Sequence, residues 1–314
     1  MKTVAFNMFA ICILLFTSCE NNRKSTNSLT SDDIHIAVDE TFRPIMEEEM
    51  NVFAGQNPEA DVKPVYCNEV EALNLFLKDS VRLAVVTRAL STKEAEAIRA
   101  NKLFLRSQRI ATDALALIVN KANPDTLIAM QTIKKIVSGK ITKWDDVPGA
   151  QTRGDLELVF DNPNSSTVRY IKDSICGGLP LEGEHLKAQK TNADVINYVS
   201  RSRNAIGVIG VDWIGNDADS TNLTFNHDVQ VMRVSNSAVA EKGNSYLPLQ
   251  YYIGTGHYPL TRAVYMLSSD PNVRSTQLSF YYFVSDTPGQ LIITKSSQLL
   301  PYMPVQYKEV SITE

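Results

Sequence analysis

Hydrophobic and polar positions along this chain follow two periods, one typical of strands and one typical of helices. Residues 34–38 alternate like a half-buried strand, and residues 42–54 carry apolar side chains at helical spacing. Further strands are predicted at 62–66, 82–86, 114–120, 156–160, 205–209 and 262–267. Further helices are predicted from 68 and from 91, and at 130–137, 165–176, 192–200, 273–284 and 288–296. This alternation predicts an α/β fold with largely parallel sheets.

The turns between these strands and helices contain hydroxyl, amide and acidic residues instead of glycine-rich phosphate loops. No GxGxxG or Walker pattern occurs, which disfavours a nucleotide-binding fold. Residues 217–221 match the Asp-x-Asp-x-Thr pattern of phosphoryl-transfer enzymes, but Gly215 and Asn216 precede them where a buried strand is needed. We predict a solvated turn there. The sequence also offers no pair of nucleophile and general base, so we do not expect an enzyme.

The N-terminus has the pattern of an export signal. Lys2 precedes an apolar stretch at 4–16, which is too short to span a bilayer but suits a signal peptide. The following Thr17-Ser18-Cys19 resembles the cleavage box of bacterial lipoproteins. We therefore predict a lipoprotein signal peptide at 1–18, lipidation of Cys19, a flexible tether at 19–32, and a place in the bacterial cell envelope, periplasmic or associated with the outer membrane. An ordinary secretory signal with an incidental cysteine is the alternative.

Composition and charge exclude several classes of function. The chain has 314 residues, a formal net charge of −4 and 21% charged residues, so a general affinity for nucleic acid is not expected. The four histidines are scattered without metal-ligand spacing, and we expect neither a metal nor a cofactor. Cys67 and Cys176 remain after the signal region is set aside. A bridge between them is disfavoured because they are placed on different lobes below.

Several segments in this order resemble the phosphate-binding family of periplasmic ABC-transporter solute receptors. The stretch Ile136–Trp144 is similar to the F-S-G-K-I-T-N-W segment of that family, and Ala205–Gly210 to its A-I-G-Y-V-G segment. The remaining segments that carry the resemblance are Thr87–Leu90, Ala114–Pro124, Tyr258–Arg262 and Phe283–Pro301. Together they extend over nearly the whole chain from Ile34 to Pro301.

The resemblance implies a type II periplasmic-binding-protein fold with two α/β lobes, a ligand cleft between them and two crossing segments. Lobe I would take residues 33–112 plus 256–314, and lobe II residues 113–255. The implied function is capture of phosphate or a related oxyanion by lobe closure, for an ABC-type permease. The protein would act as a monomer and catalyse no reaction.

The family resemblance also places four turns at the cleft. The residues that we expect to contact the ligand are Thr41, Phe42, Asn68, Thr87, Arg88, Ser165, Ser166 and Thr167. Three of the turns fall at predicted helix N-termini, where free N–H groups and the helix dipole favour an anion. Arg88 would add a two-pronged contact to an oxyanion. The alternative is that Thr41 and Ser165 are only N-caps and Arg88 only a surface ion-pair partner.

Acidic residues at the same turns depart from the family pattern. Asp39 and Glu40 stand where Gly-Ser-Thr is usual, Glu69 follows Cys67 and Asn68 where Ser and Gly are usual, and Asp161 stands where the phosphate receptors usually have Arg. A carboxylate about 4 Å from one phosphate charge costs about 4 kcal/mol at an effective dielectric of 20. These residues motivate a second hypothesis, a receptor-fold envelope lipoprotein that has lost phosphate transport and acts as a sensing or protein-interaction partner.

Two tryptophans and one cysteine could in principle take part in the site. We expect Trp144 and Trp213 to be core aromatics rather than ligand platforms. Cys67 is expected to be a half-buried structural thiol, because no histidine stands where it could activate a nucleophile.

Overall fold

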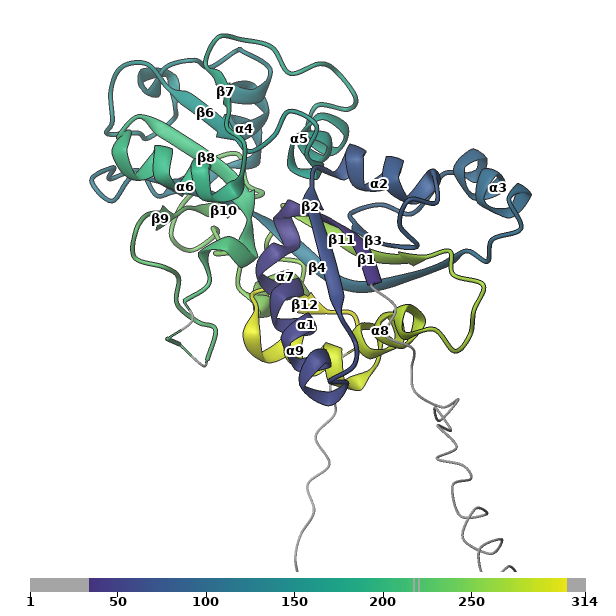
Figure 1. Ribbon diagram of the computed structural model, residues 1–314. Coiled ribbons are helices and arrows are strands. Elements are labelled where there is room, and N and C mark those ends of the chain that lie inside the picture. Colours follow the sequence, from purple (N-terminus) through teal and green to yellow (C-terminus); the bar gives the residue numbers. More distant parts are fainter. Residues whose placement is uncertain (1–33, 217, 220, 304–314) are drawn as a thin grey trace, which may run out of the picture.

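A computed structural model describes residues 34–216, 218–219 and 221–303 of the chain (Figure 1). Its centre is one ten-stranded sheet that runs through two lobes, with β2-β1-β3-β11 on one side of β4 and β8-β6-β7 on the other. The predicted α/β architecture is confirmed. The signal peptide, Cys19 and the tether lie outside the described residues. Within the described residues, no helix combines the length and the apolar character that crossing a membrane would require.

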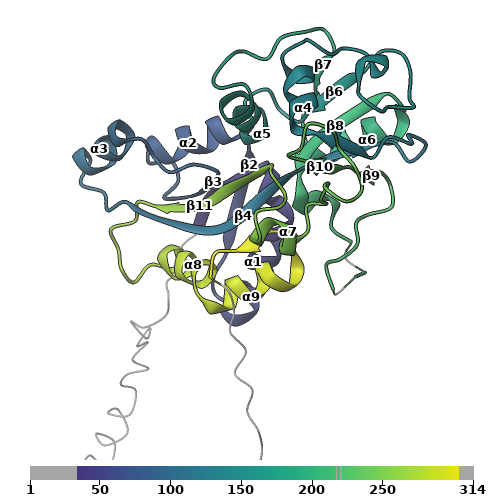
Figure 2. The same cartoon turned by 180° about the vertical axis from the view of Figure 1, so that it is seen from behind.

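Lobe I is built on the strands at one end of the sheet, with helices on both faces. Its strands are β1 (Ile34–Asp39), β2 (Val62–Cys67), β3 (Leu83–Val86), β11 (Thr261–Ser268) and the short β12 (Leu300–Pro301). One face is covered by α1 (Arg43–Gln56), α8 (Thr276–Ser285) and α9 (Thr287–Ser296), and the other by α2 (Glu69–Leu77) and α3 (Thr92–Ala100) (Figures 1 and 2). Apolar side chains from these helices form the two hydrophobic layers of the lobe.

Lobe II is built on the other end of the sheet. Its strands β6 (Glu157–Phe160), β7 (Leu186–Ala188) and β8 (Ala205–Gly210) are joined by β9 (Gln230–Val231), and β5 (Leu127–Ala129) pairs separately with β10 (Arg233–Ser235). Its helices are α4 (Met130–Val137), α5 (Ser166–Tyr170) and α6 (Asn192–Arg201), with a π-helical continuation of α5 at Ile171–Ile175. The short helix α7 (Gln250–Gly254) packs beside β12 and the end of α9 in lobe I. Short 3₁₀ turns η1 (Glu40–Phe42), η2 (Trp144–Asp146) and η4 (Val211–Ile214) complete the described elements.

The strand β4 (Arg106–Val119) belongs to both lobes. Its first half pairs antiparallel with β11 and its second half pairs antiparallel with β8. The sheet is therefore mixed, and the prediction of largely parallel sheets was wrong. Parallel neighbours need a crossover helix that returns the chain to the same edge, whereas β4 and β11 carry the chain from one lobe to the other and run against their neighbours. The prediction also missed residues 106–113 of β4, because polar side chains interrupt the apolar run there.

Most predicted elements are present within one or two residues of their expected limits. The helix predicted at 130–137 is α4 without change, and Ser91 with Glu94 forms the capping box that starts α3. Cys67 and Cys176 are free thiols, and Trp144 is fully buried, as expected. Trp213 is only partly buried and donates its indole N–H to the carbonyl of Thr41 across the lobes at 2.9 Å. The predicted lobe limits, 33–112 plus 256–314 and 113–255, stay a prediction.

Candidate functional site

Three turns that end strands in the two lobes meet at the lobe junction as helix N-termini. Asp39 caps η1 by accepting the N–H of Thr41, Asn68 caps α2 by accepting the N–H of Glu71, and Ser165 caps α5 by accepting the N–H of Val168. The prediction that these turns start helices is confirmed. Each N-terminus leaves backbone N–H groups and the positive end of a helix dipole facing the junction.

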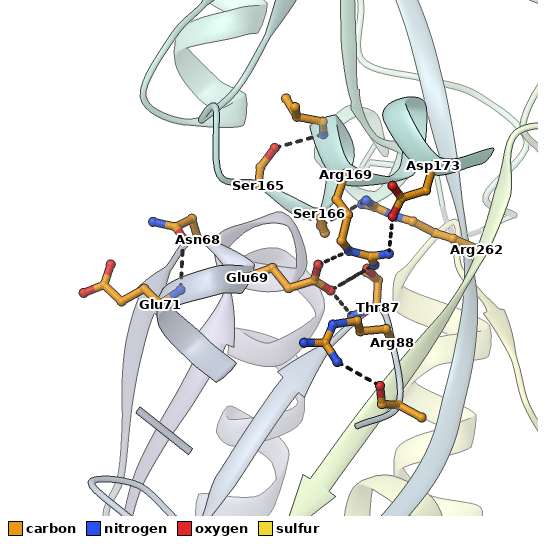
Figure 3. A network of polar contacts seen from close by, with 12 residues as sticks. Asn68, Glu69, Glu71, Thr87, Arg88, Ser165, Ser166, Arg169, Asp173 and Arg262 are labelled. Carbon is orange, nitrogen blue, oxygen red and sulfur yellow. Dashed lines mark hydrogen bonds and ion pairs between the residues drawn. The ribbon is translucent and has the colours of Figure 1, made fainter. Parts of the chain in front are cut away.

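Arg262 on β11 is the most deeply buried cation at this junction. Its Nε donates to Asp113 Oδ2 at 2.8 Å and its Nη1 donates to Ser166 Oγ at 2.9 Å, which joins the strand to α5 (Figure 3). Its Cζ lies 5.7 Å from the centre of the Phe42 ring. Asp113 and Arg262 are both buried, and Asp113, Asp39 and Glu69 all keep the guanidinium charged.

Polar atoms without a hydrogen-bond partner among the described residues gather around Arg262. Those that can donate include Arg262 Nη2, Thr41 Oγ1 next to Phe42, and Thr167 Oγ1 next to Ser166, while the carboxylate oxygens Asp39 Oδ2, Glu40 Oε1 and Asp113 Oδ1 are acceptors in the same state. Thr41 and Thr167 are fully buried. Buried polar groups are nearly always satisfied in native proteins, and each unsatisfied one costs about 1–3 kcal/mol. A guanidinium donor and two hydroxyls in this state are therefore a natural set of donors for an oxyanion.

Carboxyl groups with raised pKa values lie at the same junction. Burial raises the pKa of Asp161 to about 7, against the hydrogen bond that Ser165 Oγ donates to it at 2.6 Å. Burial and the neighbouring Glu69 raise the pKa of Asp39 to about 6. Burial also raises the pKa of Glu40, whose carboxylate accepts a hydrogen bond from Asn192 Nδ2 at 2.7 Å. Arg262 lowers the pKa of Asp161, but burial and the neighbouring Asp39 outweigh this effect.

Glu69 is the carboxylate with the most complete set of partners. Its Oε1 accepts from the N–H of Thr87 at 2.8 Å and from Thr87 Oγ1 at 2.6 Å, and its Oε2 accepts from Arg169 Nε (Figure 3). Arg169 Nη2 also donates to Thr87 Oγ1 at 2.6 Å. Thr87 therefore stands at the junction as predicted, but its hydroxyl is bound by protein groups on both sides.

Arg88 and Asn68 neighbour Thr87 and Glu69 in the chain, but their side chains bond to other groups. Arg88 forms a two-pronged ion pair with Glu94 of α3, at 2.8 and 2.7 Å, and Asn68 serves as the N-cap of α2. Of the eight predicted ligand residues, the structure thus brings Thr41, Phe42, Ser165, Ser166 and Thr167 together around Arg262. Thr87 lies beside them in the contact with Glu69. The ligand contacts predicted for all eight remain a prediction.

Two residues that sequence reasoning did not assign to the site, Arg262 and Arg169, carry its positive charge. Arg262 stood inside a quoted segment, and a charged residue within the apolar run of a buried strand is a signal of function. Arg169 lies one turn into α5, where a surface residue and a site residue look alike in sequence. No three His, Cys, Asp or Glu side chains among residues 34–303, as far as they are described, converge to hold a metal ion.

The two lobes are in close contact around this site. A Cβ on Gly210 of β8 would meet Thr41 Cγ2 of lobe I at 2.4 Å, so only glycine permits this approach. Asp212 Oδ2 of lobe II accepts a hydrogen bond from the N–H of Ile45 at 2.9 Å. It thereby caps the N-terminus of α1, where the N-cap residue Phe42 has no side-chain acceptor. The site is therefore enclosed by both lobes.

Comparison with known proteins places this architecture in a family. Residues 24–287 match the family described as the PBP superfamily domain. The chain belongs to the PBP superfamily. Its fold is that of a type II periplasmic binding protein, with two lobes joined by chain crossings.

The relatives of this PBP superfamily member include proteins named for phosphate. SphX of Synechococcus elongatus is 24% identical over 257 residues, which cover 80% of this chain and 72% of SphX. The phosphate-binding protein PstS of Staphylococcus epidermidis is 21% identical over 256 residues, which cover 80% of this chain and 73% of PstS.

Two solved structures show the same fold. A Clostridium perfringens protein with bound phosphate has a TM-score of 0.71 at 19% identity, covering 87% of this chain and 100% of that one. An ABC-type phosphate transport receptor from Vibrio cholerae has a TM-score of 0.60 at 21% identity, covering 83% and 97%.

Proposed function

We propose that this protein is a solute-binding protein that captures phosphate or a closely related oxyanion between its lobes and delivers it to an ABC-type permease. It acts as a binding protein rather than an enzyme. The observation that carries the proposal is the enclosed set of unsatisfied donors, Arg262 Nη2 with the hydroxyls of Thr41 and Thr167, at the N-termini of η1 and α5. The name of the relative PstS and the phosphate bound in the similar Clostridium perfringens structure support the same ligand class.

The acidic surroundings narrow the class of anion. A carboxylate can lie beside an oxyanion when one of the two carries a proton that they share. Inorganic phosphate carries at least one proton at neutral pH, whereas sulfate carries none. An ionised Asp161 or Asp39 can accept a hydrogen bond from the proton that phosphate carries, whereas sulfate has no proton to give, so these carboxylates would favour phosphate over sulfate. Because their pKa values are raised to about 7 and about 6, this preference should weaken as the carboxyls take up protons at lower pH.

The setting of the protein follows from its N-terminus and from its relatives. Export through the signal at 1–18 and lipidation of Cys19 would tether a monomeric receptor to the cell envelope, outside the cytoplasm. Replacing Cys19 with Ala should move the protein from the membrane fraction to the soluble fraction. Unchanged partitioning of the variant would remove the anchor from the proposal without touching the ligand.

Isothermal titration of the tag-free mature protein with phosphate and with sulfate at pH 7 tests the ligand. We expect saturable heat with phosphate and none with sulfate. Silence at millimolar phosphate would refute phosphate binding. The second hypothesis, a sensing or protein-interaction partner without a transported ligand, would then replace it. The names of the two similar structures, which mention ABC transport of phosphate, favour the first hypothesis.

A further inference from the structure

One contact joins the two lobes through an ion pair between a buried carboxylate and a partly exposed guanidinium. Arg169 on α5 of lobe II reaches Glu69 at the start of α2 in lobe I, with Nε to Oε2 at 2.5 Å and Nη2 to Oε1 at 3.2 Å. The same guanidinium donates to Thr87 Oγ1 at the end of β3. Figure 3 shows Arg169 with Glu69, Thr87 and Asp173 between the two ribbons, and α5 faces the start of α2 in both overall views (Figures 1 and 2).

The carboxylate of Glu69 is held in its ionised form by these partners. Only 1% of the residue is exposed, and burial alone would raise its pKa. The guanidinium of Arg169 and the hydroxyl and N–H of Thr87 outweigh burial and lower the pKa of Glu69 below its ordinary value. A buried charge with this many partners is strongly destabilised when the partner is withdrawn. Separation of the lobes would withdraw Arg169 from Glu69.

The contact between Arg169 and Glu69 lies far from the crossing strand about which the lobes would open. The cross-lobe contacts of Gly210, Asp212 and Trp213 lie at or just after the end of β8, which pairs directly with the crossing strand β4. Two further cross-lobe contacts, Arg262 with Ser166 and Glu40 with Asn192, start from β11, the neighbour of β4, and from the turn after β1. Glu69 follows β2, the strand furthest from β4 in lobe I. A hinge motion about β4 therefore displaces Glu69 from Arg169 more than it displaces the contacts near β8.

We propose that Glu69 and Arg169 form a latch that holds the lobes closed when no anion is bound, with Glu69 acting as a positioning residue for Thr87 and the cleft. The oxygens of Glu69 accept hydrogen bonds from Arg169 and Thr87, so these donors are not free to bind an anion. The closed state is then populated before the ligand binds, and the anion binds to the donors around Arg262. The bearing of the latch on transport rests on the proposed function, but the latch itself needs no ligand.

A control variant shows whether an effect comes from the link between the lobes or merely from removing a negative charge near Arg169. Asp173 also lies near this guanidinium, at 3.7 Å from Nη1, but it sits one turn further along in lobe II. Glu69→Gln and Asp173→Asn each remove one carboxylate charge next to the same arginine. Only the first cuts the link between the lobes.

Small-angle X-ray scattering in phosphate-free buffer measures the result. We expect the radius of gyration of E69Q to exceed that of the wild type, with the open form as the majority, while D173N keeps the wild-type value. An unchanged radius in E69Q, or an equal increase in D173N, would overturn the latch. Circular dichroism and thermal unfolding check that each variant is folded. If E69Q fails to fold, Arg169→Lys replaces it, because lysine keeps the charge but loses the two-pronged bond. We expect R169K to have a larger radius of gyration than the wild type, and an unchanged radius would overturn the latch.

Adding phosphate to E69Q separates the latch from the proposed function. Return to the compact radius supports both, since a bound anion then closes the cleft without the latch. An E69Q protein that stays expanded in phosphate supports the latch and counts against phosphate as the ligand.

Discussion

Two arginines face the lobe junction, and their surroundings differ in a way that divides their roles. Arg169 keeps about a third of its side chain exposed, and Glu69, Thr87 and Asp173 surround its donors. Arg262 is buried with Asp113, yet Nη2 of its guanidinium has no hydrogen-bond partner among the described residues. The satisfied arginine can gain little from a ligand and is suited to holding the lobes together. The unsatisfied one can gain a charge-assisted hydrogen bond, so binding energy is available there.

The largest effect is expected from changing Arg262. Replacing it with Met leaves Asp113 buried without its partner, which should cost about 3–5 kcal/mol of unfolding free energy and abolish anion binding. Replacing it with Lys keeps the charge but loses the planar fork, and should weaken phosphate binding by about 10- to 100-fold in a calorimetric titration. Arg153→Lys, the same change in an exposed ion pair with Asp145, is the control and should bind as the wild type does. Equal affinities of R262K and R153K would assign the anion to another cation.

Glu49 of α1 shows what a buried carboxyl does without an arginine. It is fully buried among apolar side chains, neither of its oxygens has a partner among the described residues, and burial raises its pKa to about 9. The folded protein therefore holds a proton that the unfolded chain releases above its ordinary pKa. Stability should fall as pH rises from about 4.5 to about 9.

Replacing Glu49 with Met should remove that pH dependence. We expect a gain of about 3 kcal/mol in unfolding free energy at pH 7 and little gain at pH 4, measured by urea denaturation. Glu59→Met, an acid-to-methionine change at an exposed turn residue, is the control. An unchanged stability of E49M at pH 7 would mean that Glu49 has a charged or hydrogen-bonding partner in solution.

The pH dependence of binding tests the acidic side of the Arg262 site. Asp161 and Asp39 titrate at about 7 and about 6, so the junction loses negative charge as pH falls from 8 to 6. Because an anion favours the protonated carboxyls, phosphate should bind about tenfold more tightly at pH 6 than at pH 8. Asp161→Asn should flatten this dependence and relax the discrimination against sulfate, whereas Asp145→Asn at the exposed ion pair should change neither. A steep dependence retained in D161N would assign it to Asp39 or to phosphate itself, whose second proton dissociates in the same pH range, and would count against Asp161.

The smallest effect is expected at Arg88, the arginine that sequence resemblance placed in the site. Its guanidinium is held by Glu94 within lobe I, outside the contacts around Arg262. Arg88→Ala should change phosphate affinity by less than about threefold, consistent with the small energies of partly exposed ion pairs. A loss as large as that of R262K would show that Arg88 leaves Glu94 to bind the anion.

Sequence alone predicts the elements and the turns of this protein well, because period and capping are local properties. The Asn68 and Ser165 caps and the buried run of β4 follow from neighbouring residues only. Strand direction was not local: β4 and β11 run against their neighbours because the chain changes lobes there.

The partners of charged side chains could not be predicted, because they too come from distant parts of the chain. Arg169 meets Glu69 across 100 residues, and Arg262 meets Asp113 across 149. Arg88, in contrast, pairs with Glu94, only six residues away in the chain. Glu94 also belongs to the capping box with Ser91, and this pair is the alternative to a ligand contact that was considered for Arg88. Of the acidic residues that looked incompatible with an anion in sequence, Glu69 is paired with Arg169, and Asp39 and Asp161 lie near Arg262; both arginines come from distant segments.

A crystal structure of the protein with phosphate tests the central claim most directly. The account predicts one anion between the lobes, within hydrogen-bond distance of Arg262 Nη2, Thr41 Oγ1 and Thr167 Oγ1, with the contact between Arg169 and Glu69 intact. Phosphate bound elsewhere, or a closed cleft in which Arg262 Nη2 bonds only to protein groups at saturating phosphate, would contradict it.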